Sequence, residues 1–279
     1  MRRETRQLLA AHARSFFSSR FTEHGRELKR LSLLAPHTPG ETALDGVPVR
    51  FHDAASYLAA RQAIELDGIY DLPASVSAAT IVDAGANLGI GVLRAMQHGA
   101  ARVVAIEADP AIFAVLEANV AVWRTRYTRT TVELIHAAIM PEAGTVSFAP
   151  NGAVGGHVVD QTSDQTISVP AIPLGPILAR LAADSPIDFV KIDIEGAEGG
   201  VLEEIVPQLP HVRRLFVEDH SIVGRPQTLP RILTLLQDAG FRLVVQCDYA
   251  PSAPLTAWTP SLGQDNRSNV FAVRDDLLA

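Results

Sequence analysis

From residue 80 onward, short apolar runs alternate with segments whose apolar residues recur at helical spacing. The runs are almost continuously apolar and rich in Val and Ile, which is typical of strands buried on both faces. We predict strands over 80–85, 102–108, 132–140, 189–196, 213–220, 241–247 and 269–274. Helical patterns separate most of these strands, so the sequence predicts a doubly wound, mostly parallel sheet with helices on both faces.

Two segments depart from this alternation. Residues 144–171 alternate apolar positions with Gly and polar residues, which indicates a β-rich insertion. Its glycine-rich part, 151–160, suits either a mobile lid or a tight hairpin, and the sequence does not separate the two. The final two strands lack a helical pattern between them and are expected to form an antiparallel hairpin. Their connection carries Tyr249 and Trp258, which suit either an acceptor face or the core.

Residues 1–79 are predicted to be a helical N-terminal extension, and residues 80–279 the main domain. Within the extension, 1–34 reads as helical and 46–70 as a short strand and a helix. The first 30 residues carry eight Arg or Lys against three Glu, whereas the whole chain has a net charge of −7. A charge run of mixed sign usually marks an exposed face. We expect a solvated helix or a homodimer contact there.

Composition excludes several classes of protein. The single cysteine, Cys247, excludes an internal disulfide framework and a multi-cysteine zinc site. No apolar run reaches the ~18–20 residues of a membrane span, and the N-terminus lacks the apolar stretch of a signal peptide. An acidic body does not suit a nucleic-acid groove, which needs clustered positive charge. We therefore expect a cytoplasmic protein with a small-molecule partner, no nucleic acid and no membrane contact.

The tips of the first two strands carry a nucleotide-binding pattern. The first strand runs into a glycine-containing turn, and Glu107 ends the second, 24 positions after Asp83. A carboxylate at the tip of the adjacent strand can accept hydrogen bonds from both hydroxyls of a ribose. The dinucleotide fingerprint would need glycine where Asn87 and Ile90 stand, which favours S-adenosylmethionine over NAD. The expected cofactor-binding residues are Asp83, Gly85, Ala86, Asn87, Gly89, Glu107, Ala108, Ala138 and Asp193.

Two further strand tips supply the candidate catalytic residues. Lys191, Asp193 and Glu195 alternate along one strand, as do Glu218 and His220 along the next, so each set shares a face. His220 is the first candidate for the general base because an unperturbed imidazole titrates near neutrality. Asp193 would orient the acceptor or contact the cofactor, and Lys191 would pair with Glu218 or Asp193.

Other interpretations of these residues stay open. Glu195 and Glu198 can simply place negative charge at the N-terminus of the next helix, and His220 can be structural. No metal ligand is assigned. Asp193, Glu218 and His220 nevertheless have the chemistry of a site for a hard metal ion, with two carboxylates and one imidazole.

Four segments resemble one known family. VDAGANLGIGV (82–92), AIEADPAIFAVLEANV (105–120), VKIDIEGAEGGVL (190–202) and VEDH (217–220) look like the FkbM family of S-adenosylmethionine-dependent methyltransferases. Gly85, Asn87, Gly89 and Glu107 match the family, whereas Ala108 stands where proline is common. The resemblance implies a class I methyltransferase fold, Rossmann-like, with a seven-stranded sheet whose last strand is antiparallel. It also implies methyl transfer, most often to a hydroxyl of a sugar or natural product.

We therefore expect an S-adenosylmethionine-dependent O-methyltransferase acting on a small molecule, with Lys191, Asp193, Glu218 and His220 serving the reaction. The sequence leaves hydroxyl and carboxylate acceptors open. A nicotinamide-dependent oxidoreductase on a similar sheet is one alternative, and a non-catalytic scaffold that keeps the nucleoside site is another.

Overall fold

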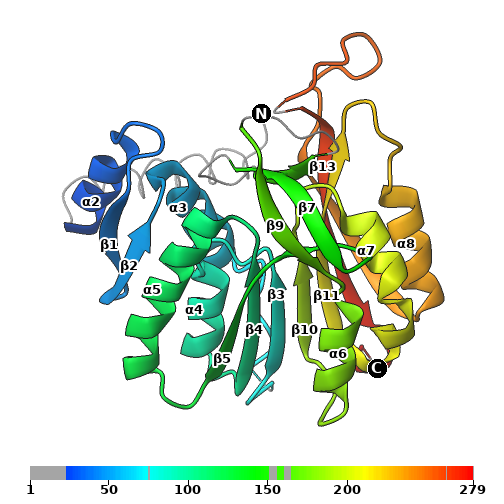
Figure 1. Cartoon of the computed structure of the whole chain (residues 1–279), viewed down its shortest axis with the longest axis horizontal. Helices are drawn as coiled ribbons and strands as arrows, with labels where there is room; N and C mark the ends of the chain where they lie inside the picture. Colours follow the sequence, from blue (N-terminus) through cyan, green and yellow to red (C-terminus); the bar gives the residue numbers. More distant parts are fainter. Residues whose placement is uncertain (1–22, 75, 151–155, 160–164, 262, 279) are drawn as a thin grey trace, which may run out of the picture.

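A seven-stranded sheet runs through the centre of the molecule (Figure 1). The structure, a computed structural model, describes residues 23–74, 76–150, 156–159, 165–261 and 263–278. The sheet strands are β3 (Thr80–Ala84), β4 (Arg102–Glu107), β5 (Thr131–His136), β10 (Phe189–Ile192), β11 (Arg214–Ile222), β12 (Phe241–Tyr249) and β13 (Gln264–Arg274). Each predicted strand therefore exists, with ends shifted by a few residues.

The strand order is β12-β13-β11-β10-β3-β4-β5. The pairs from β11 through β10, β3 and β4 to β5 are parallel, whereas β13 runs antiparallel to both β11 and β12. This confirms the predicted hairpin of the last two strands and the mostly parallel sheet with an antiparallel last strand. The carboxyl ends of β3, β4 and β10 therefore lie side by side at one edge.

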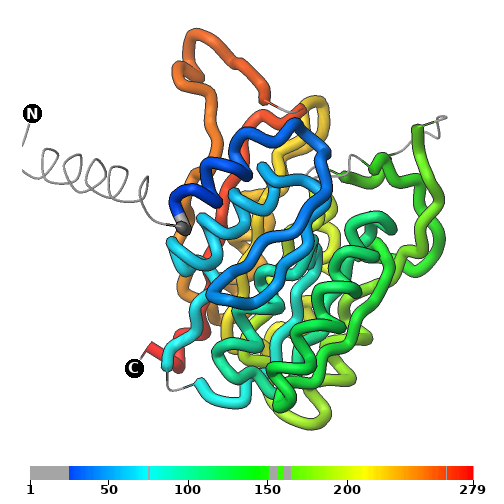
Figure 2. Tube along the Cα trace, turned by 90° about the vertical axis from the view of Figure 1, so that its left-hand side faces the viewer, coloured from blue at the N-terminus to red at the C-terminus, as the bar shows by residue number. Residues whose placement is uncertain are grey.

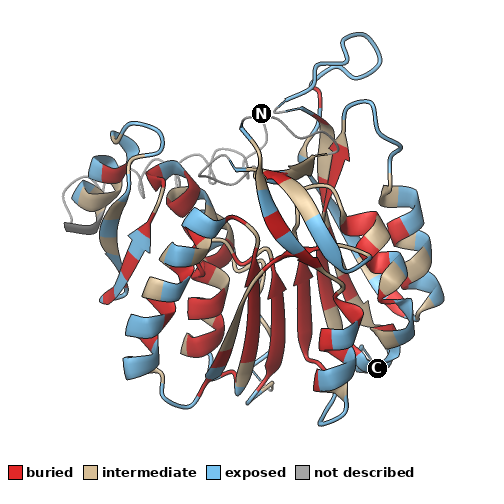
Figure 3. Ribbon diagram, viewed as in Figure 1, coloured by how far each residue is buried: buried red, intermediate tan, exposed pale blue. Residues whose placement is uncertain are grey.

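Helices cover both faces of the sheet, as the buried strands require (Figure 3). Along β4, Val103 and Ala105 belong to one hydrophobic cluster, and Val104 and Ile106 to the other. The first cluster includes residues of α4 (Ile90–Gln97) and α5 (Pro110–Arg126). The second includes residues of α6 (Gly175–Ala182), α7 (Glu198–Glu204), the 3-10 helix η2 (Val206–His211) and α8 (Leu229–Asp238). Of these, α6 was not predicted.

The extension is not purely helical, which corrects the prediction for residues 1–79. Its described part contains α2 (Glu23–Ser32), a hairpin of β1 (Gly40–Leu44) and β2 (Val47–Phe51), α3 (Ala54–Ala60) and the π-helix η1 (Arg61–Leu66). Asp45 and Gly46 form the turn, both with positive φ (49° and 74°). Asp-Gly between short strands is a strong hairpin signal, so the sequence did contain this information.

The hairpin packs against α5 through β2, and Figure 2 shows the hairpin in blue on the side of the molecule that faces the viewer. The Trp123 indole donates a hydrogen bond to the Pro48 carbonyl at 2.7 Å. The Asn119 side chain accepts one from the Arg50 N–H at 2.7 Å and donates one to its carbonyl at 2.9 Å. The extension thus shares the core of α5. The division at residue 79 and the homodimer stay predictions, and residues 1–22 lie outside the described residues.

The insertion forms a second, four-stranded sheet with the order β6-β9-β7-β8. Its strands are β6 (Ala138–Ile139), β7 (Gly144–Ala149), β8 (His157–Val159) and β9 (Ile167–Ile172). The predicted strand 132–140 is thus two strands, because β6 leaves the central sheet and pairs with β9. The small sheet lies beyond the carboxyl ends of the central strands (Figure 1). The lid hypothesis for 151–160 stays untested, since most of that segment lies outside the described residues.

The connection between β12 and β13 projects into solvent. Trp258 is 56% exposed, and its indole N–H bonds Asp265 at 2.8 Å, so the alternative that Trp258 closes the core is wrong. After β13 the described chain ends in the 3-10 helix η3 (Asp275–Leu277). Among the helices that the structure describes, none has the length and apolar character needed to cross a bilayer.

Candidate functional site

A cavity of about 320 Å³ lies at the carboxyl ends of β3, β4 and β10. Its volume is in the range of small-molecule sites. Strand-tip residues form one wall, and the insertion adds Phe148 and Val158. All the residues expected to bind the cofactor line this cavity except Gly89. Lys191 and Glu218 also line it, whereas His220 does not.

The turn after β3 needs glycine for reasons of protein packing. Gly85 has φ +84°, and a Cβ there would lie 1.8 Å from the Asp193 backbone oxygen. Gly89 has φ +95°, and a Cβ there would lie 2.7 Å from Leu116. Both glycines were expected to let a ligand approach the backbone. Gly85 does line the cavity, whereas Gly89 does not, and at both positions the neighbouring strand β10 or helix α5 also occupies the space that a side chain would need.

Glu107 is buried at the tip of β4 and holds the turn in place. Its two carboxylate oxygens accept hydrogen bonds from the Asn87 N–H at 2.9 Å and the Asp109 N–H at 2.8 Å. Burial raises the pKa of Glu107 to about 7, against the opposing effect of these two N–H groups. Each oxygen keeps a further lone pair, so Glu107 can still accept hydrogen bonds from a ligand in the cavity.

Lys191 lies between two carboxylates on the floor of the site. Its ammonium is 3.2 Å from Asp83 Oδ1 and 3.2 Å from Asp193 Oδ2, and it donates a hydrogen bond to the Gly85 carbonyl. Burial alone would lower the pKa of Lys191, but the two carboxylates outweigh it and raise that pKa well above its usual range. Lys191 is therefore a charged structural link between β3 and β10. The predicted pairing with Asp193 is present.

The N-terminal extension contributes part of the cavity wall, which the sequence did not suggest. Residues of α3 and η1, together with Ile69 and Tyr70, line the cavity. The Tyr70 ring packs edge-on against Phe216, with 5.0 Å between centroids, and lies 5.9 Å from the Lys191 ammonium. No motif marks Tyr70, because its place depends on how the extension packs on the sheet.

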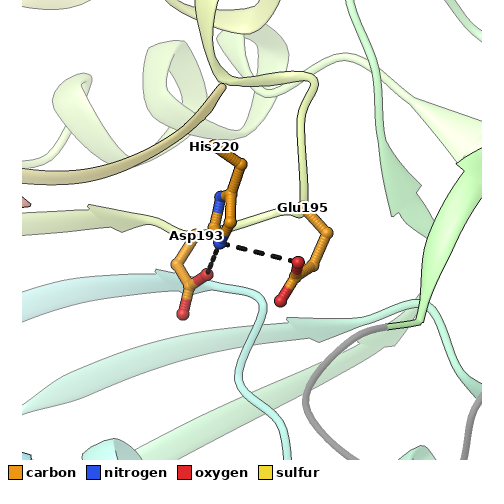
Figure 4. A group of neighbouring side chains, drawn as sticks. All are labelled: Asp193, Glu195 and His220. Carbon is orange, nitrogen blue, oxygen red and sulfur yellow. Dashed lines mark ion pairs between the residues drawn. The ribbon is translucent and has the colours of Figure 1, made fainter. Parts of the chain in front are cut away.

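His220 is enclosed beneath a group of acidic side chains. Its Nδ1 is 2.8 Å from Glu198 Oε1, and its Nε2 is 3.5 Å from Glu195 Oε2 and 3.9 Å from Asp193 Oδ1 (Figure 4). Burial alone would lower the pKa of His220, but the acidic neighbours, Glu198 first, raise it to about 10.

This environment corrects the expectation that His220 is the general base. Its side chain has no exposed surface and does not line the cavity, so Asp193 and Glu195 stand between it and an acceptor. The raised pKa also favours the protonated imidazole, which is a poorer proton acceptor.

Glu198 does more than place charge at a helix terminus. Besides contacting His220, its Oε1 accepts hydrogen bonds from the Ile194 N–H at 3.2 Å and the Gly196 N–H at 3.0 Å. Glu198 thus fixes the loop after β10 and the orientation of the imidazole together. A glutamate in the first turn of a helix looks ordinary in sequence, and only the fold shows that its carboxylate points inward.

Glu218, on β11, also lines the cavity and is held by an arginine. Its Oε1 is 2.9 Å from Arg267 Nε on β13 and 3.7 Å from His220 Nε2. Burial raises the pKa of Glu218 to about 7, and that of Glu195 to about 8. Arg267 was missed from the sequence because it lies on an antiparallel strand far along the chain.

One group of side chains has the geometry of a metal site. Ligand atoms of Asp193, Glu195 and His220 all lie within 4.8 Å of one another. The open alternative named Glu218 in place of Glu195. In the structure, the Glu218 oxygen that faces His220, Oε1, is paired with Arg267.

A comparison with models of protein families finds that the model described as the methyltransferase FkbM domain matches residues 83–243 of the chain. The chain belongs to the FkbM methyltransferase family. It is therefore a methyltransferase that uses S-adenosylmethionine, and the nicotinamide alternative is set aside. The match covers the cavity-lining strand tips of β3, β4 and β10 but stops before Arg267.

Solved structures with similar folds are distant in sequence. An FkbM methyltransferase from Methylobacillus flagellatus KT is 20% identical with a TM-score of 0.44, over 73% of this chain and 45% of that one. Aeropyrum pernix fibrillarin, solved with natively bound S-adenosyl-L-methionine, is 13% identical over 87% and 86% of the two chains, with a TM-score of 0.44. Magnesium protoporphyrin IX methyltransferase from Synechocystis PCC 6803, solved with bound SAM, is 13% identical over 94% and 96%, with a TM-score of 0.43. No curated protein matches the sequence significantly.

Proposed function

We propose that this FkbM methyltransferase methylates a hydroxyl group of a small molecule. The observation that carries the proposal is the acidic lining of the cavity beside the strand tips. Asp193, Glu195, Glu218 and Asp248 line it there, against the two cations Lys191 and Arg267. The two cations are already paired with carboxylates, and burial keeps Glu195 and Glu218 partly protonated by raising their pKa values to about 8 and about 7. Such a lining offers hydrogen-bond partners to a neutral hydroxyl but no free positive charge to a phosphate or a carboxylate, which favours a neutral acceptor over a nucleic acid or a carboxylic acid.

The residues of the cavity fit S-adenosylmethionine. Glu107 has spare lone pairs for the ribose hydroxyls. Ala108, Ala138 and Ile139 give an apolar wall for the adenine, and Asp83 and Asp193 offer negative charge near the sulfonium and amino groups. When bound, the cofactor would supply a methyl group attached to a positively charged sulfur. The acceptor oxygen would give the electron pair of the new carbon–oxygen bond, and the sulfur would keep the electrons of the broken carbon–sulfur bond.

We propose that Glu218 accepts the proton that the acceptor hydroxyl loses. It lines the cavity, offers carboxylate lone pairs, and is held in one orientation by Arg267. Asp193, whose Oδ1 lies near the same His220 nitrogen as Glu218 Oε1, would accept a second hydrogen bond from the acceptor. A positioned proton acceptor contributes about 10²–10⁴-fold to rate. The proton then passes from Glu218 to solvent.

Replacing Glu218 by glutamine should lower kcat by about 10²–10⁴-fold while changing the Kd of S-adenosylhomocysteine by less than about threefold. The measurements are turnover by mass spectrometry on a panel of hydroxylated metabolites, and calorimetry. The matched control is Glu203→Gln, because Glu203 is half exposed and pairs with Arg231 at the surface. Unchanged turnover in Glu218→Gln would rule out this assignment.

The affinity for S-adenosylhomocysteine should depend on pH through Glu107. Binding uses the ionised carboxylate, whereas the free protein holds a proton on Glu107 below pH 7 because burial raises its pKa to about 7. Lys191 favours the ionised form and Asp109 opposes it. From pH 8 to pH 6 the affinity should therefore fall about tenfold, measured by calorimetry.

The Glu107→Gln variant separates this effect from other titrations in the cavity. Glutamine cannot ionise, so its pH dependence should be lost. Its affinity at pH 8 should be about 10–100-fold weaker, the value of a hydrogen bond to a charged group. If the affinity of the wild-type protein for S-adenosylhomocysteine did not change from pH 6 to 8, the role of Glu107 would be contradicted.

Tight binding of S-adenosylhomocysteine without methyl transfer to any acceptor would favour the alternative of a non-catalytic scaffold.

A further inference from the structure

The His220 imidazole has one nitrogen that the protein leaves without a hydrogen bond. Nε2 is buried and finds no hydrogen-bond partner within the part of the chain that the structure describes. It faces Glu195 Oε2 at 3.5 Å and Asp193 Oδ1 at 3.9 Å (Figure 4). Glu218 Oε1 is also 3.7 Å away but is held by Arg267. Leaving a buried polar atom unpaired costs about 1–3 kcal/mol. An arrangement that carries this cost indicates a ligand between the three side chains.

The other nitrogen of His220 is arranged as in histidines that bind metals. A metal-bound imidazole usually donates its second ring N–H to a carboxylate, which fixes its orientation and strengthens it as a ligand. Here Nδ1 lies 2.8 Å from the buried carboxylate of Glu198. Because Glu198 is itself held by two backbone N–H groups, Nε2 is aimed firmly at Asp193 and Glu195.

We propose that Asp193, Glu195 and His220 bind one divalent cation of the Mg²⁺ or Mn²⁺ type. Oxygen-rich sets with one imidazole suit such ions. With metal–ligand distances of about 2.1 Å, neighbouring ligands lie about 3 Å apart. The observed separations of 3.5 and 3.9 Å need only a small contraction, and the incoming positive charge offsets the repulsion between the two carboxylates.

The neighbouring charges decide which oxygens are available. Lys191 pairs with Asp193 Oδ2 and leaves Oδ1 on the His220 side. Arg267 pairs with Glu218 Oε1, so Glu195 completes the set of ligands.

The backbone at Glu195 is strained, since its φ of +60° is a left-handed conformation that costs a non-glycine residue about 1–3 kcal/mol. Ligation requires Nε2 to give up its proton, and metal affinity generally rises with pH for this reason.

The cation would lie in the wall of the cavity. Asp193 and Glu195 line the cavity and His220 lies behind them, so the remaining coordination positions face the acceptor. A divalent cation there would hold an acceptor hydroxyl and favour loss of its proton. This role rests on the proposed function, whereas the binding site itself does not.

Titration of the EDTA-treated full-length protein with Mn²⁺ at pH 8, followed by electron paramagnetic resonance, tests the proposal. We expect one equivalent to bind, Mg²⁺ to compete for it, and electron spin echo spectra to show a directly bound nitrogen. Asp193→Asn and Glu195→Gln should weaken binding at least tenfold. His220→Gln should do the same and abolish the nitrogen signal. Glu203→Gln, a carboxylate outside the group, should leave binding unchanged.

Two outcomes would overturn the site. One is the absence of saturable binding at millimolar Mn²⁺. The other is binding that all three variants keep or that shows no nitrogen coupling. Thermal unfolding checks that each variant is folded. If His220→Gln does not fold, Glu195→Gln is the decisive variant. Calorimetry with S-adenosylhomocysteine on the same samples separates a failed metal site from a failed methyltransferase assignment.

Discussion

Replacing Lys191 by methionine is expected to lower the free energy of unfolding by about 3–5 kcal/mol. The substitution keeps most of the length of the side chain but removes the charge between Asp83 and Asp193. Lys191 and Asp83 are both buried, so water cannot replace the lost partner, and two carboxylates are left facing each other. Urea unfolding followed by circular dichroism measures the change.

A surface ion pair gives the matched control for this prediction. Arg180 pairs with Glu133 at 2.9 Å, and both side chains are about half exposed. Solvent screens such pairs, so Arg180→Met should cost at most about 1 kcal/mol. If Lys191→Met cost no more than Arg180→Met, the buried link between β3 and β10 would not stabilise the fold as we describe.

The second large effect is expected for Gly85→Ala. The added Cβ would lie 1.8 Å from the Asp193 backbone oxygen, so the turn or the tip of β10 has to move. The turn is also tied to β4, since the N–H groups of Gly85 and Ala86 both bond the Ile106 carbonyl at 2.9 Å. We expect a loss of at least about 3 kcal/mol, together with loss of S-adenosylhomocysteine binding, because the turn and the Asp193 tip both line the cavity.

Gly99→Ala separates the clash from the backbone strain. Gly99 has a similar φ of +77°, but nothing lies within 4 Å of a Cβ added there. Its substitution carries only the left-handed penalty of about 1–2 kcal/mol. The difference between the two variants therefore measures the contact with β10. Equal losses of stability would show that strain alone explains the effect at Gly85.

The sequence predicted most of the central sheet because burial on both faces leaves a local signature. Runs such as 80–85 and 102–108 are mostly apolar, and strands of a sheet with helices on both sides give that pattern. It missed α6, and it did not resolve β6 from β5. Within the extension, the sequence predicted a short strand in the region of β2 but missed β1, although the Asp45-Gly46 turn indicates a hairpin.

The cofactor end of the site was easier to predict than the acceptor end. Glu107 and the turn at 85–89 follow directly from strand tips that are neighbours in the sheet, so spacing along the chain was informative. By contrast, Arg267 and Tyr70 reach the cavity from segments far apart in sequence. The burial of His220 also depends on contacts between segments far apart in sequence. The sequence therefore predicted a general base where the structure has an enclosed imidazole surrounded by carboxylates.

What the sequence determined by itself was the order of buried strands along the chain, the family, and the acidic residues at the strand tips. These follow from the local apolar pattern and from motifs that each span at most 16 residues. Only the tertiary structure decided why Gly85 must be glycine, which oxygen Lys191 leaves free, and which nitrogen of His220 stays unpaired. Those facts depend on atoms brought together from different elements, and pairwise contact across a fold leaves no mark in the local sequence.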